Sequence, residues 1–165
     1  KESIKETWEK LNQVAKGNKA VIYENQDNLI FILAPIKTKT FSNERIALSL
    51  SKQIQDILKN HNKFFKQKLD FGLSLNYGSI IAKQEAGVLK FMSMGAFITD
   101  AKRIASSSKE EILLGKDIVQ KLGSSVKAEK VVQGSLVFYK VQRIREDNPE
   151  HKKFLDNFVR GLEKK

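Results

Sequence analysis

The segment Leu73-Ser74-Leu75-Asn76-Tyr77-Gly78-Ser79-Ile80-Ile81-Ala82 decides the fold of this chain. Its first half continues an alternation that begins at Leu69, with apolar residues at every second position and polar or small residues between them. A period of two is typical of a strand that buries one face. Gly78 permits a turn into the apolar run at 79–82. The segment therefore predicts a strand, a turn and a second strand.

The rest of the chain alternates between helical and extended patterns. Apolar residues recur at helical spacing in five segments, namely 1–16, 42–61, 96–105, 118–122 and, after Asn148-Pro149, 148–165. The run Ser106-Ser107-Ser108 is expected to end the third of these helices. Short β-prone runs predict hairpins at 20–23 with 29–34 and at 126–132 with 136–144, and further strands at 88–94 and 112–114. A polar loop is expected after Pro35. This order predicts a single α+β domain in which helices pack on one mixed, largely antiparallel sheet.

Composition excludes several classes of site. The 165 residues include no Cys, so disulfides, thiolate metal sites and a cysteine nucleophile are ruled out. His61 and His151 are far apart in sequence, which leaves little material for a zinc site. No apolar run approaches the roughly 20 residues that span a membrane, and the N-terminus is too charged for a signal peptide. We expect a cytoplasmic protein, and the absence of an initial Met indicates a fragment or a processed chain.

The formal net charge of +11 raises the question of nucleic acid as a partner. The basic residues are mostly Lys, and they are scattered along the chain among acidic and amide residues. Such a pattern favours a solvated lysine-rich surface over a binding site. A basic module that binds nucleic acid or an acidic partner remains an alternative, with Phe64, Phe65 and Phe71 as candidates for base stacking.

Four segments in a fixed order resemble the catalytic domain of class III adenylate and guanylate cyclases. Residues 73–82 resemble the family pattern I-G-I-H-T-G-x-V-V-A, and residues 90–103 resemble Y-x-x-x-G-D-x-V-N-x-A-x-R. Residues 23–31 fall where the family has K-x-x-G-D-x-x-x-x-F, and Glu111-Ile112-Leu113-Leu114 falls at its next short strand. The resemblance covers residues 1–147 without the family's first strand, and implies a ferredoxin-like or palm-type fold. Residues 148–165 are a helical extension.

A second family, the diguanylate cyclases with their GGDEF signature, shares a related palm-like core. Residues 25–29 could be an altered version of that signature hairpin. Such a domain normally ends soon after the helix that contains Arg103, whereas this chain continues with further strands. The class III cyclases are therefore the better match.

The resemblance implies an incomplete metal site. In class III cyclases two Asp carboxylates hold two Mg²⁺ or Mn²⁺ ions, which activate the ribose hydroxyl for attack on the α-phosphate. Asp27 matches the second carboxylate, while the first belongs to a strand that would precede Lys1. Gln26 replaces the neighbouring family Gly.

The implied nucleotide-binding residues are also altered. The family's transition-state Asn and Arg correspond to Thr99 and Arg103, so only the guanidinium is retained. The base-reading Lys and the Asp or Thr correspond to Tyr23 and Met92, which cannot make the same hydrogen bonds to ATP or GTP.

The resemblance implies that active sites form between two head-to-tail domains. We therefore expect a homodimer, or a heterodimer with another cyclase-like domain, and no catalysis by this chain alone. The predicted function is that of a degenerate cyclase-like domain, a pseudoenzyme that dimerises and regulates signalling, with nucleotide sensing as one form of that role. An active adenylate or guanylate cyclase, completed by an upstream segment or a partner chain, is the enzymatic alternative.

Overall fold

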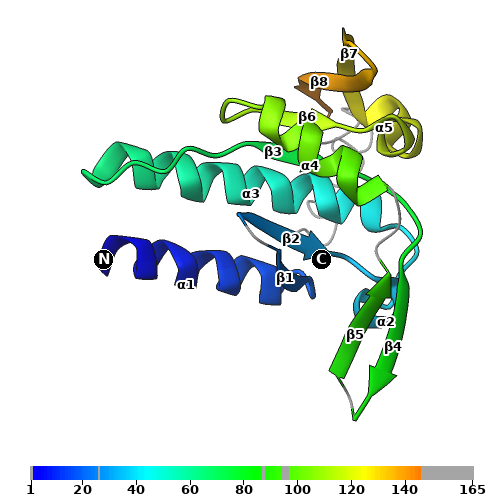
Figure 1. Ribbon diagram of the computed structural model, residues 1–165, viewed down its shortest axis with the longest axis horizontal. Coiled ribbons are helices and arrows are strands. Elements are labelled where there is room, and N and C mark those ends of the chain that lie inside the picture. The colour runs from blue at the N-terminus through cyan, green and yellow to red at the C-terminus, as the bar shows by residue number, and fades with distance from the viewer. Residues whose placement is uncertain (1, 26, 87, 94–96, 146–165) are drawn as a thin grey trace, which may run out of the picture.

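Two long antiparallel helices pack against each other, and the first of them lies along one edge of the molecule (Figure 1). The computed structural model describes residues 2–25, 27–86, 88–93 and 97–145. The predicted C-terminal helix at 148–165 lies outside the described residues. Helix α1 spans Glu2–Gly17 and helix α3 spans Asn43–Phe64.

The first predicted hairpin is confirmed. Strands β1 (Val21–Asn25) and β2 (Asn28–Ile32) pair antiparallel, with Val21 opposite Ile32 and Asn25 opposite Asn28. The pairing continues further into the polar segment than the sequence predicts, because Asn25 and Asn28 still belong to the strands.

The connection after β2 contains a short helix where a loop was expected. Helix α2 spans Pro35–Thr38, with Pro35 in the first turn, where a missing N–H costs no hydrogen bond. The polar loop expected directly after Pro35 therefore begins only after Thr38, and the prediction was wrong for residues 36–38.

Strand β3 (Leu73–Leu75) is shorter than the alternation from Leu69 predicts. The side chain of Asn62 in α3 takes the place of a neighbouring strand at Leu69: its Oδ1 accepts a hydrogen bond from the Leu69 N–H at 2.7 Å, and its Nδ2 donates to the Leu69 carbonyl at 2.8 Å. The backbone polar groups at Leu69 are thus satisfied without a sheet.

A four-stranded mixed sheet contains the second half of the chain. Its order is β3-β6-β8-β7, where β6 is Ile112–Leu114, β7 is Val126–Gln133 and β8 is Leu136–Ile144. Strand β3 runs parallel to β6, and the other two pairs are antiparallel. Gly134 has a φ of +61° in the turn between β7 and β8, which confirms the predicted second hairpin.

Helices cover both faces of this sheet. Helix α3 and helix α5 (Lys116–Leu122) pack on one face around Leu48, Leu114 and Ile118. Helix α4 (Phe97–Ser107) packs on the other face, where Ile104 meets Leu113 and Phe138.

Helix α4 is longer than its sequence suggests. The serine run was expected to end it, but Ser106 and Ser107 remain helical. Their hydroxyls donate hydrogen bonds to the carbonyls of Lys102 and Arg103, one turn earlier in the helix. The expected end at Ala105 was therefore wrong by two residues.

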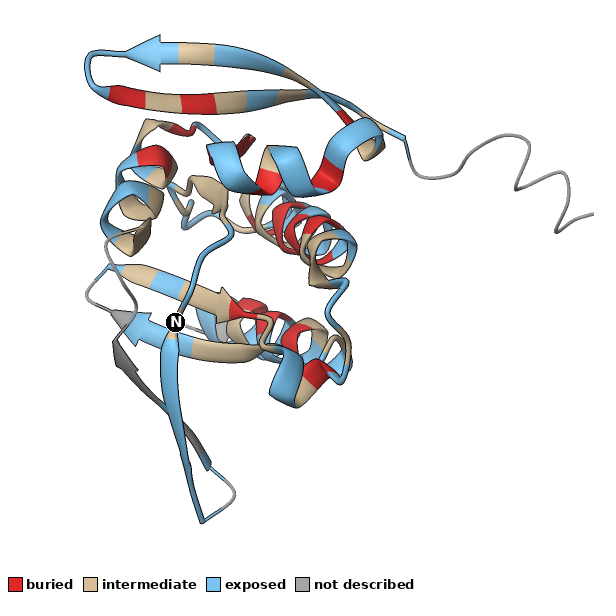
Figure 2. Cartoon of the chain, turned by 90° about the vertical axis from the view of Figure 1, so that its right-hand side faces the viewer, coloured by how far each residue is buried: buried red, intermediate tan, exposed pale blue. Residues whose placement is uncertain are grey.

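Strands β4 (Ile81–Glu85) and β5 (Val88–Ser93) form a separate two-stranded arm. Every residue of β4 is exposed (Figure 2). At the end of the arm, the ammonium groups of Lys83 and Lys90 lie 2.8 and 3.3 Å from Glu85. Hydrogen bonding to Lys83, and then to Lys90, lowers the pKa of Glu85 below its usual value. The arm is therefore held by its own backbone and ion pairs.

The predicted α+β class, with helices packed on a mixed sheet, is confirmed, but the strands that the structure describes do not form one continuous sheet. They form the hairpin β1-β2, the four-stranded sheet and the arm. Phe31 in β2 and Leu73 in β3 pack against one shared core around Leu11, Leu50 and Ile54. The hairpin and the four-stranded sheet thus cover the same pair of helices without pairing with each other.

Candidate functional site

The residues implicated by sequence lie in three places. Tyr23 lies in β1, and Asp27 lies in the loop between β1 and β2. Tyr23 is 38% exposed and Asp27 is exposed. Across the residues that the structure describes, no three His, Cys, Asp or Glu side chains gather closely enough to hold a metal ion. The carboxylate of Asp27 by itself does not fit a two-metal site.

Thr99 and Arg103 lie on the outer face of α4, one turn apart and both exposed. A guanidinium nitrogen of Arg103 lies 3.8 Å from a carboxylate oxygen of Asp100. Such a solvent-exposed pair contributes at most about 1 kcal/mol and leaves the guanidinium available to an anion. The structure therefore places this predicted pair side by side on one helical face.

The inner face of α4 is fixed to β3 by close contacts. The hydroxyl of Ser74 donates to the Ala101 carbonyl at 2.7 Å and accepts from Nδ2 of Asn76 at 2.9 Å. At Gly72, an added Cβ would lie 2.0 Å from the Ala105 carbonyl oxygen. These contacts hold α4 on the sheet, so the exposed residues of the helix have a defined position.

Met92 lies in β5 of the arm. Ser93 pairs with Ile81 and Phe91 pairs with Ala82, so the register shifts at Met92. A shift of this kind is typical of a β-bulge, which bends the backbone of a strand.

The chain does not bring these groups together. The hairpin β1-β2 lies on one side of α3 and helix α4 lies on the other, and they remain apart in both views (Figures 1 and 2). The arm that contains Met92 extends away from both. A single copy of this chain therefore presents Tyr23 and Asp27 apart from Thr99 and Arg103, and all four are exposed.

Sequence reasoning missed a surface hollow of about 720 Å³ beside the first turn of α4. It is lined by Tyr77, Gly78, Ser79, Phe97, Asp117, Gln120 and Lys121. The ammonium of Lys121 lies 4.9 Å from the centre of the Tyr77 ring, within the range of a cation–π interaction. The hollow includes neither Thr99 nor Arg103, and its charged residues, Asp117 and Lys121, come from α5, which has no recognisable motif. The turn predicted at Gly78 was the only feature of the sequence analysis that pointed to this part of the surface.

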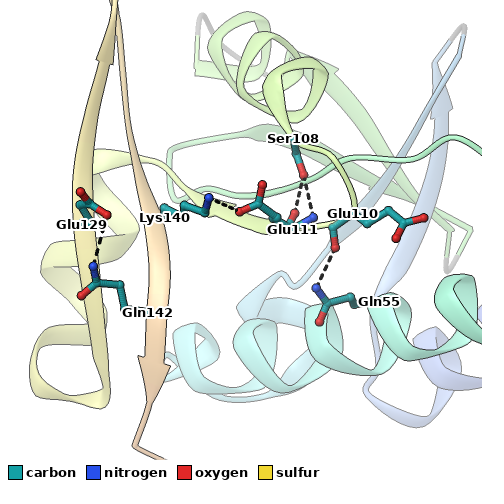
Figure 3. A network of polar contacts seen from close by, with 7 residues as sticks. All are labelled: Gln55, Ser108, Glu110, Glu111, Glu129, Lys140 and Gln142. Atoms are coloured by element: carbon teal, nitrogen blue, oxygen red, sulfur yellow. Dashed lines mark hydrogen bonds and ion pairs between the residues drawn. The ribbon is translucent and has the colours of Figure 1, made fainter.

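A polar network on the sheet is structural (Figure 3). The ammonium of Lys140 lies 2.8 Å from the Glu111 carboxylate, and this hydrogen bond and charge raise the pKa of Lys140. Nε2 of Gln55 donates to the Glu110 carbonyl at 2.8 Å, and Glu110 has a φ of +64°. Glu110 and Glu111 connect α4 to β6, and the bond from Gln55 holds this connection against α3.

Structural comparison gives the fold family. The chain is similar to the adenylyl cyclase CyaB from P. aeruginosa, with a TM-score of 0.68 and 15% identity over 89% of this chain and 84% of that one. It is also similar to the guanylate cyclase domain of RhGC from Catenaria anguillulae, solved in complex with GTP, with a TM-score of 0.64 and 17% identity over 86% and 82% of the two chains.

A third neighbour is a dimeric guanylyl cyclase domain of the RhoGC fusion protein from Blastocladiella emersonii, with a TM-score of 0.66 and 17% identity over 86% of this chain and 82% of that one. The same domain has also been solved as a monomer. No protein-family model and no curated protein sequence matches the chain. The fold is that of the class III nucleotidyl cyclase catalytic domains.

Proposed function

We propose that this chain, which has the fold of the class III nucleotidyl cyclase domains, is a degenerate member that dimerises and regulates signalling in the cytoplasm. The observation that carries the proposal is the separation of Asp27 and Tyr23 on one hairpin from Thr99 and Arg103 on α4. Each exposed group is half of a site, so a second domain is needed to complete it. In the part of the chain that the structure describes, no helix is long and apolar enough to cross a membrane.

Three replacements in the sequence support a regulatory role over catalysis. Tyr23 and Met92 stand where the family reads the base, and Thr99 stands where it has Asn. A phenol and a thioether cannot replace the hydrogen bonds of a Lys and a carboxylate. Removing one preorganised transition-state contact costs an enzyme about 3 kcal/mol, and several such losses compound to many orders of magnitude in rate.

The arm β4-β5 supports dimerisation. A two-stranded hairpin alone is only marginally stable in water, and this one buries none of its first strand against the body. Ile81 is 66% exposed and Val88 is 58% exposed. Packing these side chains against a second copy would remove apolar surface from water and stabilise the arm.

Light scattering of the purified chain tests this part of the proposal. We expect the mass of a dimer, and we expect Ile81→Asp to weaken dimerisation by at least about tenfold, because it places a charge in an apolar contact. Val132→Asp is the matched control, since Val132 is 60% exposed but lies at the far end of β7. A monomeric wild-type chain, or equal effects of the two changes, would contradict dimerisation through the arm.

Nucleotide sensing is tested by calorimetric titration of ATP and GTP, each with Mn²⁺. We expect weak binding that Arg103→Ala reduces by about tenfold, because a charge-assisted hydrogen bond to phosphate contributes roughly 1.5–3 kcal/mol. Arg45→Ala, which removes another exposed guanidinium from α3, is the control. If no nucleotide binds, the chain is a protein-interaction module and the sensing role is wrong.

The enzymatic alternative has one supporting observation, since Asp27 and Arg103 are both exposed and able to face a partner domain. A heterodimer could then supply the missing carboxylate and base readers. Metal-dependent cyclase activity with a partner chain, lost in Asp27→Ala, would establish this alternative and replace the pseudoenzyme interpretation.

A further inference from the structure

The loop between α2 and α3 presents an aromatic ring to water. Phe41 is 92% exposed, more than any other large apolar residue that the structure describes. Burying a Phe side chain removes about 150–250 Å² of surface from water and stabilises the buried state by roughly 1.5–3 kcal/mol. Leaving this ring in water forgoes that stabilisation, so its position points to a partner.

The exposure of Phe41 follows from a well-ordered backbone. Thr40 is the centre of the loop: its Oγ1 accepts from the Ser42 N–H at 3.1 Å, and its carbonyl accepts from Nδ2 of Asn43 at 3.0 Å. The buried Thr38 hydroxyl donates to the Ala34 carbonyl at 3.2 Å. These bonds fix the residues on both sides of Phe41, so the ring projects from a held loop.

The segment of the chain that carries the ring is cationic. Lys37 and Lys39 precede Phe41 in the segment 36–41, which contains no acidic residue, and Ile36 adds a second apolar side chain that is 48% exposed. Lys39 has a φ of +63°, and its N–H bonds to the Pro35 carbonyl at 2.8 Å. The whole chain carries a net charge of +11, which attracts it to anionic surfaces over about a Debye length.

We infer that residues 36–41, the end of α2 and the start of the loop after it, here called the Phe41 loop, bind the surface of an anionic phospholipid bilayer. The ring enters the headgroup region, where amphipathic and aromatic side chains are stable, and the lysine ammonium groups lie at lipid phosphates. The inference does not depend on the proposed cyclase-like function.

A bilayer fits this surface better than a protein does. A stable protein interface buries about 800 Å² per partner around a packed apolar centre. The Phe41 loop instead offers one protruding ring and a half-exposed Ile among lysines and threonines. A fluid anionic surface accepts a protrusion without a matching cavity, and each lysine near it contributes about 1 kcal/mol.

Sedimentation with phosphatidylcholine vesicles, with and without phosphatidylserine, tests the inference on the full chain. We expect binding only when phosphatidylserine is present. Phe41→Ser should weaken it about tenfold, and Lys37→Gln or Lys39→Gln about fivefold each. Because the Phe41 side chain is almost fully exposed, the serine variant should unfold in urea at the same midpoint as the wild type.

Phe64→Ser is the matched control. Phe64 is 70% exposed near the end of α3, and the ammonium of Lys63 lies 5.5 Å from its ring centre, so it offers similar chemistry at another site. The Phe64→Ser variant should bind vesicles as strongly as the wild-type chain does. Absence of binding to phosphatidylserine vesicles, equal losses in Phe41→Ser and Phe64→Ser, or a Phe41→Ser variant that keeps vesicle binding but changes the mass in light scattering would each overturn the inference.

Discussion

Replacing Gly72 with alanine is expected to destabilise the chain by about 3 kcal/mol or more, because there is no room for a Cβ. The added atom would lie 2.0 Å from the Ala105 carbonyl oxygen and 2.8 Å from that of Ser108. Both are backbone atoms at the end of α4, so no side-chain rotation relieves the clash. Helix α4 would have to move away from β3, which would also displace Thr99 and Arg103. The free energy of unfolding in urea measures the effect.

Gly17→Ala is the matched control for this prediction. Gly17 is the last residue of α1, and an added Cβ there meets no atom within 4 Å. The change should be neutral or should stabilise the chain by up to about 1 kcal/mol, because alanine restricts the unfolded chain. A Gly72→Ala variant as stable as the wild type would show that α4 does not approach β3 so closely.

The second large effect is expected at Leu114. This residue is 0% exposed in β6, between β3 and β8, and it belongs to the core that α3 and α5 cover. Leu114→Ala removes its buried side chain and leaves a cavity between the sheet and the helices. We expect a loss of about 2–5 kcal/mol in the free energy of unfolding.

Leu29→Ala makes the same chemical change on β2, where Leu29 is 40% exposed. Leu29→Ala should lower the free energy of unfolding by less than about 1 kcal/mol, since removal of a partly exposed side chain leaves no closed cavity. Similar losses in the two variants would contradict the placement of the main core around β6.

Local patterns predicted most of the elements correctly. The alternation in β8, the helical spacing in α1 and α3, and glycine in the turn at Gly134 each depend on a few neighbouring residues. Such patterns are readable because a helix or a strand repeats its buried face at a constant interval. They led to the confirmed α+β class, whereas Thr99 and Arg103 on α4 came from the resemblance to the cyclases.

The errors arose where distant residues replaced local interactions. The alternation from Leu69 suggested strand, but Asn62 of α3 satisfies the backbone there with its side chain. The hollow beside Tyr77 includes residues from α5, and neither segment shows alone that the two will meet. The exposure of Phe41 could not be predicted from the sequence either, because an aromatic residue between two helices can lie in the core or on the surface.

The sequence by itself determined which segments form most of the helices and strands, and its resemblance to the cyclases implied candidates for nucleotide contact that stay predictions. The tertiary structure decided that the strands of the described residues form three separate sheets and that the hairpin with Asp27 lies apart from the helix with Arg103. The physical reason is the range of the forces. Periodic burial and turn geometry act over a few residues, whereas the pairing of strands and the assembly of a site depend on which distant apolar faces share one core.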